Sequence, residues 1–167
     1  MNDRLDIKTP RGQATKIQEL EAYFIFERRY TGYKIKHTDK DEPEIFDGWI
    51  MRDGKKRALV ETKCRYDKNY HEFTTEYKNE WLITESKIQR AAACARRECL
   101  PLYGILYIVR GQALIVKRLM DKTGAVIEHR TQEGPTKATV NGGTAVRLNA
   151  FIDISDCTPI YMVEPKT

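Results

Sequence analysis

Residues 44–65 read EIFDGWIMRDGKKRALVETKCR, and this stretch decides the fold. Its two apolar runs, 45–51 and 57–64, lie on either side of an Asp-Gly pair. Because Asp-Gly tolerates positive φ, the pattern predicts two antiparallel strands joined by a tight hairpin. The second strand ends with Glu61 and Lys63, two charged side chains that a buried strand does not need. Their position indicates a functional site at the end of the hairpin.

The hairpin also brings a second acid towards Glu61. Pairing through the Asp-Gly turn places Asp47 opposite Glu61 or within one step of it. Since strand side chains alternate, Lys63 shares the face of Glu61. Neighbouring carboxylates repel each other, and oxygen ligands without cysteine or histidine suit Mg²⁺ or Mn²⁺. The simpler alternative is a hairpin with a charged, solvated outer face, on which Asp47 caps a turn.

The rest of the chain predicts an α/β domain with a mixed central β-sheet flanked by helices. A helix rich in small residues follows the hairpin and leads into a continuous apolar strand. The order strand, helix, strand predicts a right-handed crossover and a parallel pair in one sheet. The polar and aromatic tract 65–79 is expected to form a loop or a partly helical excursion. The expected helices cover 13–30 and 84 or 86 to 99, and the expected strands cover 33–38, 45–51, 57–64, 81–84, 100–109, 113–119, 125–130 and 145–154, with a turn at 140–144.

Composition is that of one globular domain. The chain has 167 residues, 41% hydrophobic and 32% charged, and its net charge of +5 makes a polyanion a plausible partner. No apolar run reaches the length of about 18 residues that spans a bilayer, and the amino terminus lacks a signal-peptide core. We therefore expect a cytoplasmic protein of a bacterial or phage-infected cell, with no membrane contact. The four cysteines, which show neither zinc-site spacing nor a disulfide framework, are Cys64, Cys94, Cys99 and Cys157.

The hairpin motif resembles the active-site signature of the PD-(D/E)XK nuclease superfamily. Its parts here are the Phe46-Asp47 pair, thirteen intervening residues and the Glu61-Thr62-Lys63 triplet, with Phe46 in place of the family's proline. The resemblance covers about residues 12–110 and implies a restriction-endonuclease-like fold and metal-dependent hydrolysis of DNA. It implies that Asp47, Glu61 and the main-chain carbonyl of Thr62 bind the metal. It also implies that Lys63 positions the attacking water or steadies the transition state.

Members of this superfamily often add a glutamate from the first helix, and the candidates here are Glu19 and Glu21. Glu21 shares its helix face with Ile17, Leu20 and Phe24. A carboxylate on an apolar stripe expected to face the core is more anomalous than one facing solvent. We therefore predict that Glu21 is the fourth catalytic residue. The alternative is that both glutamates are ordinary helix formers.

Three cations near the motif are candidate contacts for nucleic acid. Lys87 and Arg90 follow helical spacing on the second helix, and Lys87 resembles the auxiliary lysine of many family members. Arg65 comes immediately after the motif. Basic stripes are also common on solvated helix faces, which is the alternative for all three.

Taken with the resemblance, the sequence predicts a Mg²⁺-dependent (or Mn²⁺-dependent) DNA endonuclease. We treat 1–167 as a single domain in which 112–167 is a β-rich C-terminal extension. So short a chain leaves no room for a recognition domain, which favours structure-dependent or low-specificity cleavage, including branched DNA of phage or plasmid recombination and repair. A homodimer would let two sites cut two strands. The alternative is a non-catalytic nucleic-acid-binding module on the same fold.

Overall fold

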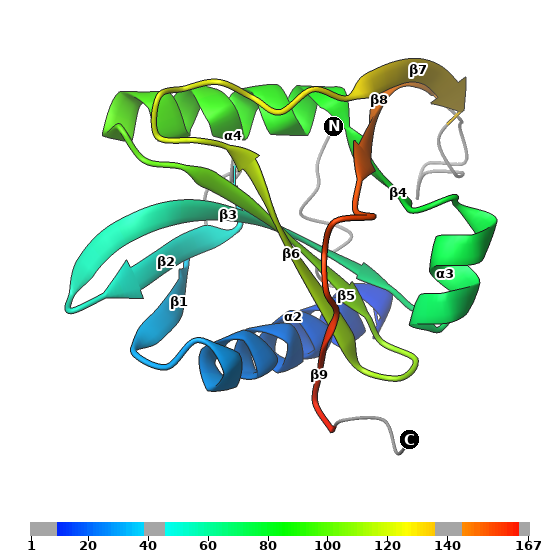
Figure 1. Cartoon of the computed structure of the whole chain (residues 1–167), viewed down its shortest axis with the longest axis horizontal. Coiled ribbons are helices and arrows are strands. Elements are labelled where there is room, and N and C mark those ends of the chain that lie inside the picture. The colour runs from blue at the N-terminus through cyan, green and yellow to red at the C-terminus, as the bar shows by residue number, and fades with distance from the viewer. Residues whose placement is uncertain (1–9, 39–45, 136–144, 164–167) are drawn as a thin grey trace.

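The computed structural model describes residues 10–38, 46–135 and 145–163 (Figure 1). In chain order the elements are α2 Pro10–Arg29, β1 Tyr33–His37, β2 Gly48–Arg52, β3 Lys55–Arg65, α3 Tyr70–Glu76, β4 Glu80–Thr84, α4 Glu85–Glu98, β5 Leu102–Ile108, β6 Ala113–Met120, β7 Arg130–Pro135, β8 Val146–Asp153 and β9 Ile160–Tyr161. A mixed six-stranded sheet has the order β1-β2-β3-β5-β6-β9, and a three-stranded sheet has the order β4-β8-β7. The helices α2 and α4 cover opposite faces of the larger sheet (Figure 1). This arrangement confirms the predicted α/β architecture with a mixed central sheet flanked by helices.

The predicted hairpin and parallel pair are confirmed. Asp53 and Gly54 have φ values of 51° and 70°, and the turn they form joins β2 to β3. The antiparallel register pairs Gly48 with Val60, and one further step of the same register places Asp47 opposite Glu61. Strand β3 is parallel to β5, as the crossover requires, whereas the 81–84 strand, β4, belongs to the smaller sheet.

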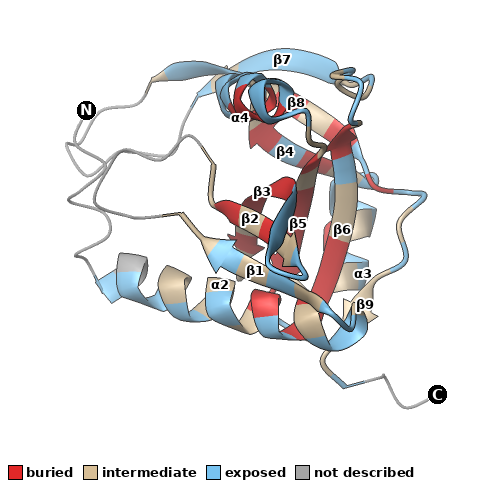
Figure 2. Ribbon diagram, turned by 90° about the vertical axis from the view of Figure 1, so that its left-hand side faces the viewer, coloured by how far each residue is buried: buried red, intermediate tan, exposed pale blue. Residues whose placement is uncertain are grey.

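Burial is concentrated in the central strands of the larger sheet (Figure 2). On one face, α4 packs through small residues, among them Ala91, Ala92 and Ala95, each fully buried. The absence of long side chains there lets the helix lie close to the strands. Strand β4 adds Trp81, also fully buried, whose ring fills the space above Gly104 of β5.

On the other face, α2 buries a different stripe from the one expected. Its core-facing residues lie between positions 22 and 26, and Tyr23 is only 4% exposed. The stripe of Ile17, Leu20 and Phe24, predicted to face the core, is instead 67%, 58% and 54% exposed. The prediction was wrong because residues 22–26 are all apolar, so the sequence does not fix the rotation of the helix about its axis.

Two segments differ in detail from expectation. The 65–79 tract contains the helix α3, so its partly helical reading is confirmed. The predicted strand over 125–130 is wrong, because Val126 forms only an isolated bridge with Met120 before β7 begins. Two backbone hydrogen bonds, from the Ile127 N–H to the Leu119 carbonyl and from the Asp121 N–H to the Ala125 carbonyl, connect this stretch to the end of β6 without forming a strand ladder. The predicted 140–144 turn lies outside the described residues.

The C-terminal third is shared between the two sheets. Strands β6 and β9 extend the larger sheet beyond β5, and β7 and β8 form the smaller sheet with β4.

None of the helices in the described part of the chain is long and apolar enough to cross a membrane. All four cysteines are free thiols.

A buried ion pair fixes the start of α4 to the segment before β7. His129 Nε2 lies 2.7 Å from Glu85 Oε2, and His129 Nδ1 lies 2.8 Å from the carbonyl oxygen of Ile127. The side chains of His129 and Glu85 are 10% and 15% exposed. Burial would lower the pKa of His129, but hydrogen bonds to the Ile127 carbonyl and to Glu85 outweigh it, so the pKa is raised.

The Trp81 contact predicts that Gly104→Ala destabilises the protein. A Cβ at Gly104 would lie 2.7 Å from the Trp81 ring and 3.1 Å from Leu119 Cδ1. Since this part of the core has no room to yield, we expect a loss of about 1 to 3 kcal/mol in the free energy of unfolding, measured with denaturant. Gly134→Ala is the control, because the added methyl meets only the side-chain amide of Asn149, at 3.3 Å. Equal losses in the two variants would contradict the packing argument.

The His129 ion pair predicts a pH-dependent stability. Because the folded-state pKa is raised above the unfolded value of about 6.5, the contribution is complete below about pH 6.5 and is lost as pH rises through the folded-state pKa. We expect His129→Gln to lower the free energy of unfolding by about 1 to 2 kcal/mol near about pH 5.5, and by less at alkaline pH. Thermal unfolding across this range, beside the exposed-site control His71→Gln, measures the difference. A gap between wild type and His129→Gln that does not change with pH would rule out this contribution.

Candidate active site

The two faces of β3 bring different residues to the two helices. Leu59 belongs to the core under α4, whereas Val60 belongs to the core under α2. By alternation, Glu61 and Lys63 lie on the α4 side, and Thr62 lies on the α2 side. The end of β3 therefore connects both layers of the protein.

Glu61 is a buried carboxylate with only 2% of its surface exposed. In the parallel register its neighbour on β5 is Gly104, the residue covered by Trp81. Lys63 Nζ lies 3.1 Å from Glu61 Oε1, and Lys87 Nζ of α4 lies 3.6 Å from the same oxygen. Burial raises the pKa of Glu61, and the Lys63 ammonium opposes that effect without cancelling it. Two ammonium groups thus compensate one acid that is almost inaccessible to water.

The two lysines respond to this arrangement in opposite ways. Burial alone would lower the pKa of Lys63, but the negative charges of Glu61 and Asp47 outweigh it, and the pKa is raised. The pKa of Lys87 is lowered, first by the positive charge of Lys63 and then by burial. Lys87 is the more accessible of the two, with 49% of its side chain exposed against 24% for Lys63.

Asp47 is held opposite this cluster by the backbone around it. Its Oδ2 accepts a hydrogen bond of 2.7 Å from the main-chain N–H of Thr62. Its own N–H donates to the carbonyl of Val60, and its carbonyl accepts from the N–H of Thr38. Its charge contributes to the raised pKa of Glu61, as expected for two acids that lie close together. The structure therefore brings together Asp47, Glu61, Thr62, Lys63 and Lys87.

The α2 side of the site depends on a tyrosine that the sequence analysis did not single out. Tyr23 Oη and Thr62 Oγ1 form a buried hydrogen bond of 2.9 Å. Burial raises the pKa of Tyr23, and the negative charges of Asp47 and Glu19 raise it further. Since Glu19 precedes Tyr23 by one helical turn, it is the helix acid on the side of the site. The sequence held one signal for this pair: Tyr23 follows Glu19 by four residues, so the two lie on the same side of the helix.

Glu21, the predicted helix acid, is placed elsewhere. Its Oε1 accepts a hydrogen bond from Gln112 Nε2, and it contributes to the raised pKa of Tyr107, an effect in which burial is the largest cause. Tyr107 lies in the core under α2, at the far end of β5. The structure therefore does not bring Glu21 to Asp47 and Glu61. The choice of Glu21 rested on the stripe that the helix rotation leaves exposed.

The oxygen donors that this site could offer a hard divalent cation are two carboxylates and one main-chain carbonyl. No group of three or more histidine, cysteine, aspartate or glutamate side chains that could hold a metal occurs among the described residues. The side-chain donors for Mg²⁺ would be Asp47 and Glu61, with the Thr62 carbonyl as a main-chain donor. Mg²⁺ is commonly bound by one or two carboxylates together with waters and substrate phosphate. Two neighbouring acids meet that minimum.

The remaining predicted contacts are not equally placed. Arg65 donates to the carbonyls of Cys64 and of Leu82, so its guanidinium links β3 to β4, and burial lowers its pKa. Arg90 is exposed on α4, one turn beyond Lys87. Of the three predicted cations, only Lys87 contacts an acid of the site.

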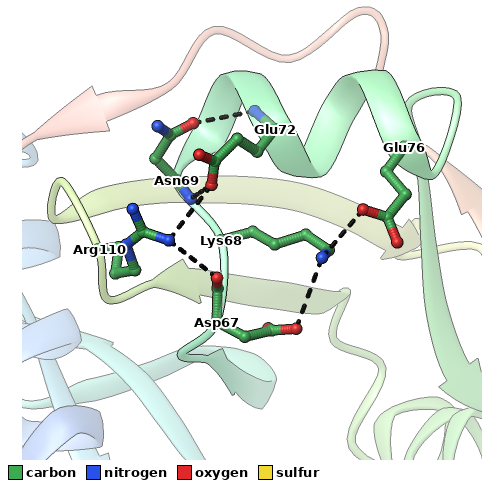
Figure 3. Close-up of polar contacts among 6 residues, drawn as sticks. All are labelled: Asp67, Lys68, Asn69, Glu72, Glu76 and Arg110. Atoms are coloured by element: carbon green, nitrogen blue, oxygen red, sulfur yellow. Dashed lines mark hydrogen bonds and ion pairs between the residues drawn. The ribbon is translucent and has the colours of Figure 1, made fainter.

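The basic and aromatic tract after the motif is a folded element with paired charges (Figure 3). A capping box starts α3. The Glu72 main-chain N–H donates to Asn69 Oδ1, and the Asn69 main-chain N–H donates to Glu72 Oε2, each at 2.9 Å. Lys68 forms an ion pair of 2.9 Å with Glu76, and Arg110 forms one of 3.4 Å with Glu72. These cations stabilise α3 and its connection to β5 and β6.

The Tyr23 hydrogen bond predicts a measurable contribution to stability. Tyr23→Phe removes one buried hydroxyl and leaves Thr62 Oγ1 without this partner, so we expect the free energy of unfolding to fall by about 1 kcal/mol. Tyr77→Phe removes the same atom from a residue that is 43% exposed and is the control. Denaturant unfolding of both variants measures the effect. A Tyr23→Phe protein as stable as wild type would show that this hydrogen bond does not hold α2 against β3.

No protein-family model matches the chain, and no curated protein matches its sequence. What the protein does is therefore inferred from the arrangement of Asp47, Glu61 and Lys63 at the end of β3.

Proposed function

We propose that this protein is a metal-dependent DNA nuclease whose active site is formed by Asp47, Glu61 and Lys63. The observation that carries the proposal is the placement of Glu61, a carboxylate 2% exposed, beside a lysine at 3.1 Å and near a second acid. Burying an acid costs stability even when partners offset part of the cost, and perturbed acids and lysines gather at functional sites. A hairpin with a solvated charged face would leave Glu61 exposed, so burial argues against that alternative.

Each residue has a role in the proposed hydrolysis. Asp47, Glu61 and the Thr62 carbonyl would hold Mg²⁺ or Mn²⁺, which when bound polarises a phosphate oxygen and lowers the pKa of bound water. Lys63 would orient the attacking water or stabilise the negative charge that develops on the phosphate. Lys87, half exposed beside Glu61, would bind a neighbouring phosphate of the strand. Tyr23 positions Thr62 through its hydroxyl.

DNA is the proposed substrate, with branched or otherwise distorted forms preferred, in a phage or plasmid recombination or repair setting inside the cell. A homodimer would place two such sites on two strands. For the helix acid, the position one turn before Tyr23 makes Glu19 a stronger candidate than Glu21.

A non-catalytic nucleic-acid-binding module is the second candidate, and one observation favours it. Lys63 and Lys87 both lie within 4 Å of Glu61 Oε1, at 3.1 and 3.6 Å, so the acid is compensated by the protein itself. A site of this kind can keep its acid as a structural partner of two phosphate-binding lysines. The two candidates differ in whether removing a carboxylate changes turnover or only binding.

The cleavage test uses variants that preserve shape. Glu61 is too buried for truncation to alanine to leave the fold undisturbed, so Glu61→Gln, Asp47→Asn and Lys63→Met are compared with wild type on supercoiled, linear, flapped and four-way-junction DNA. We expect Mg²⁺-dependent or Mn²⁺-dependent cutting that EDTA abolishes, and a loss of about 100-fold or more in each variant. Asp53→Asn, the same change in an exposed acid of the hairpin turn, should cut normally.

Two results would contradict the nuclease. Cutting that survives Asp47→Asn or Glu61→Gln would place the activity elsewhere in the chain or in a contaminant. Tight binding to one DNA shape without cutting in either metal would favour the binding module.

A further inference from the structure

A groove lies beside the acid pair, at the open edge of the larger sheet. Its volume is about 500 Å³, and it is lined by Lys36, His37, Thr38, Trp49 and Lys56. This volume falls within the range of about 300–1,000 Å³ that is typical of ligand pockets. Among the described residues that line it, none is acidic. The described lining of the groove is therefore positive and partly aromatic.

The groove and the acid pair lie on the same face of the sheet. The register pairs Lys36 with Trp49, and Trp49 with Leu59. Since paired residues on neighbouring strands share a face, Trp49 and Lys36 lie on the face of Leu59 and Glu61. Thr38, at the groove, donates its N–H to the carbonyl of Asp47 at 3.2 Å. A chain that crosses the acid pair towards β1 would therefore run along this groove.

The aromatic wall of the groove is fixed in place from two sides. The Phe46 ring packs edge-on against Trp49, with ring centroids 4.8 Å apart. Phe46 directly precedes Asp47 in the chain, so the aromatic wall is built next to the acid. On the open side, Lys56 Nζ lies 3.8 Å from the centroid of the Trp49 ring. The irregularity of pairing at Ile50 and Met51 puts Lys56 opposite Met51, and hence on the face of Trp49.

This combination matches the way proteins hold unpaired nucleotides. Bases stack on aromatic rings, and cations beside the ring neutralise the phosphates. Lys36 and Lys56 flank Trp49 from neighbouring strands, while a cation over an exposed ring contributes only about 0.5 to 1 kcal/mol to stability by itself. A surface cation–π contact needs only one lysine and one ring. This groove has two lysines, a ring packed against Phe46 and a volume of ligand size.

We propose that the Lys36–Trp49–Lys56 groove binds one unpaired nucleotide of the DNA strand that enters the active site. Its base lies against Trp49, where it displaces the Lys56 ammonium from the ring, and its phosphate lies between Lys36 and Lys56. The identification of the ligand as DNA rests on the proposed function. The groove would give the enzyme its preference for DNA with an unpaired segment next to the cleaved bond.

The test uses the fluorescence of the full-length protein. Of the two tryptophans in the chain, Trp81 is fully buried, so only Trp49 can contact a ligand. A short oligothymidylate added in EDTA should quench the emission, and Trp49→Phe should abolish the quenching. We expect Trp49→Ala and Lys56→Ala each to weaken binding about tenfold, as measured by anisotropy of a labelled strand.

Lys55→Ala is the matched control, because Lys55 pairs with Arg52 and its side chain points to the opposite face from Lys56. If Lys55→Ala and Lys56→Ala weaken binding equally, the effect reflects the overall charge of the protein, and the proposed groove is overturned. An abasic oligonucleotide that binds as tightly as oligothymidylate would overturn the stacking on Trp49. Quenching that persists in Trp49→Phe would do the same.

Failure of this proposal can be told apart from failure of the nuclease. The titration contains no metal, so quenching by DNA in a protein that never cuts would support the groove and overturn the proposed activity alone. Metal-dependent cutting of flapped DNA that is unchanged in Trp49→Ala and Lys56→Ala would support the nuclease and overturn the groove alone.

Discussion

The structure depends on how one buried charge is compensated. Glu61 lies in the central parallel pair of the larger sheet, beneath Trp81 and beside Gly104, where an ionised carboxylate is costly unless paired. Lys63 reaches it from the same strand, and Lys87 reaches it from α4. Because one partner comes from a helix, the position of α4 against the sheet and the charge balance of the site are coupled.

Thr62, the next residue of the same strand end, is fixed by two hydrogen bonds. Thr62 donates its N–H to Asp47 and shares its hydroxyl with Tyr23 of α2. Consecutive residues of β3 thus connect α2, the hairpin and α4 at a single point. A site at such a junction is rigid, because movement of any one layer would break a buried polar contact in another.

Local patterns in the sequence were sufficient to predict the hairpin, its register and the face shared by Glu61 and Lys63, since an Asp-Gly turn and a period of two fix all of these. The rotation of α2 was not predictable, because residues 22–26 are all apolar and the outcome depends on which of them face the sheet. That error led directly to the choice of Glu21, which instead lies with Gln112. The 125–130 segment was also mispredicted: its apolar residues make only isolated backbone contacts with the end of β6, and the sequence pattern does not distinguish these from a strand.

The distribution of charge across the sheet face explains how a polyanion could approach a pair of acids. Lys63 and Lys87 contact Glu61, and Lys36 and Lys56 line the groove on the same face of the sheet. For the proposed DNA substrate, these lysines would attract the phosphates at long range. Both ammonium groups approach Glu61 Oε1, and Glu61 is one of the two carboxylates that would hold a cation in the proposed nuclease. The acid pair and its lysines are therefore better understood as one unit than as opposed charges.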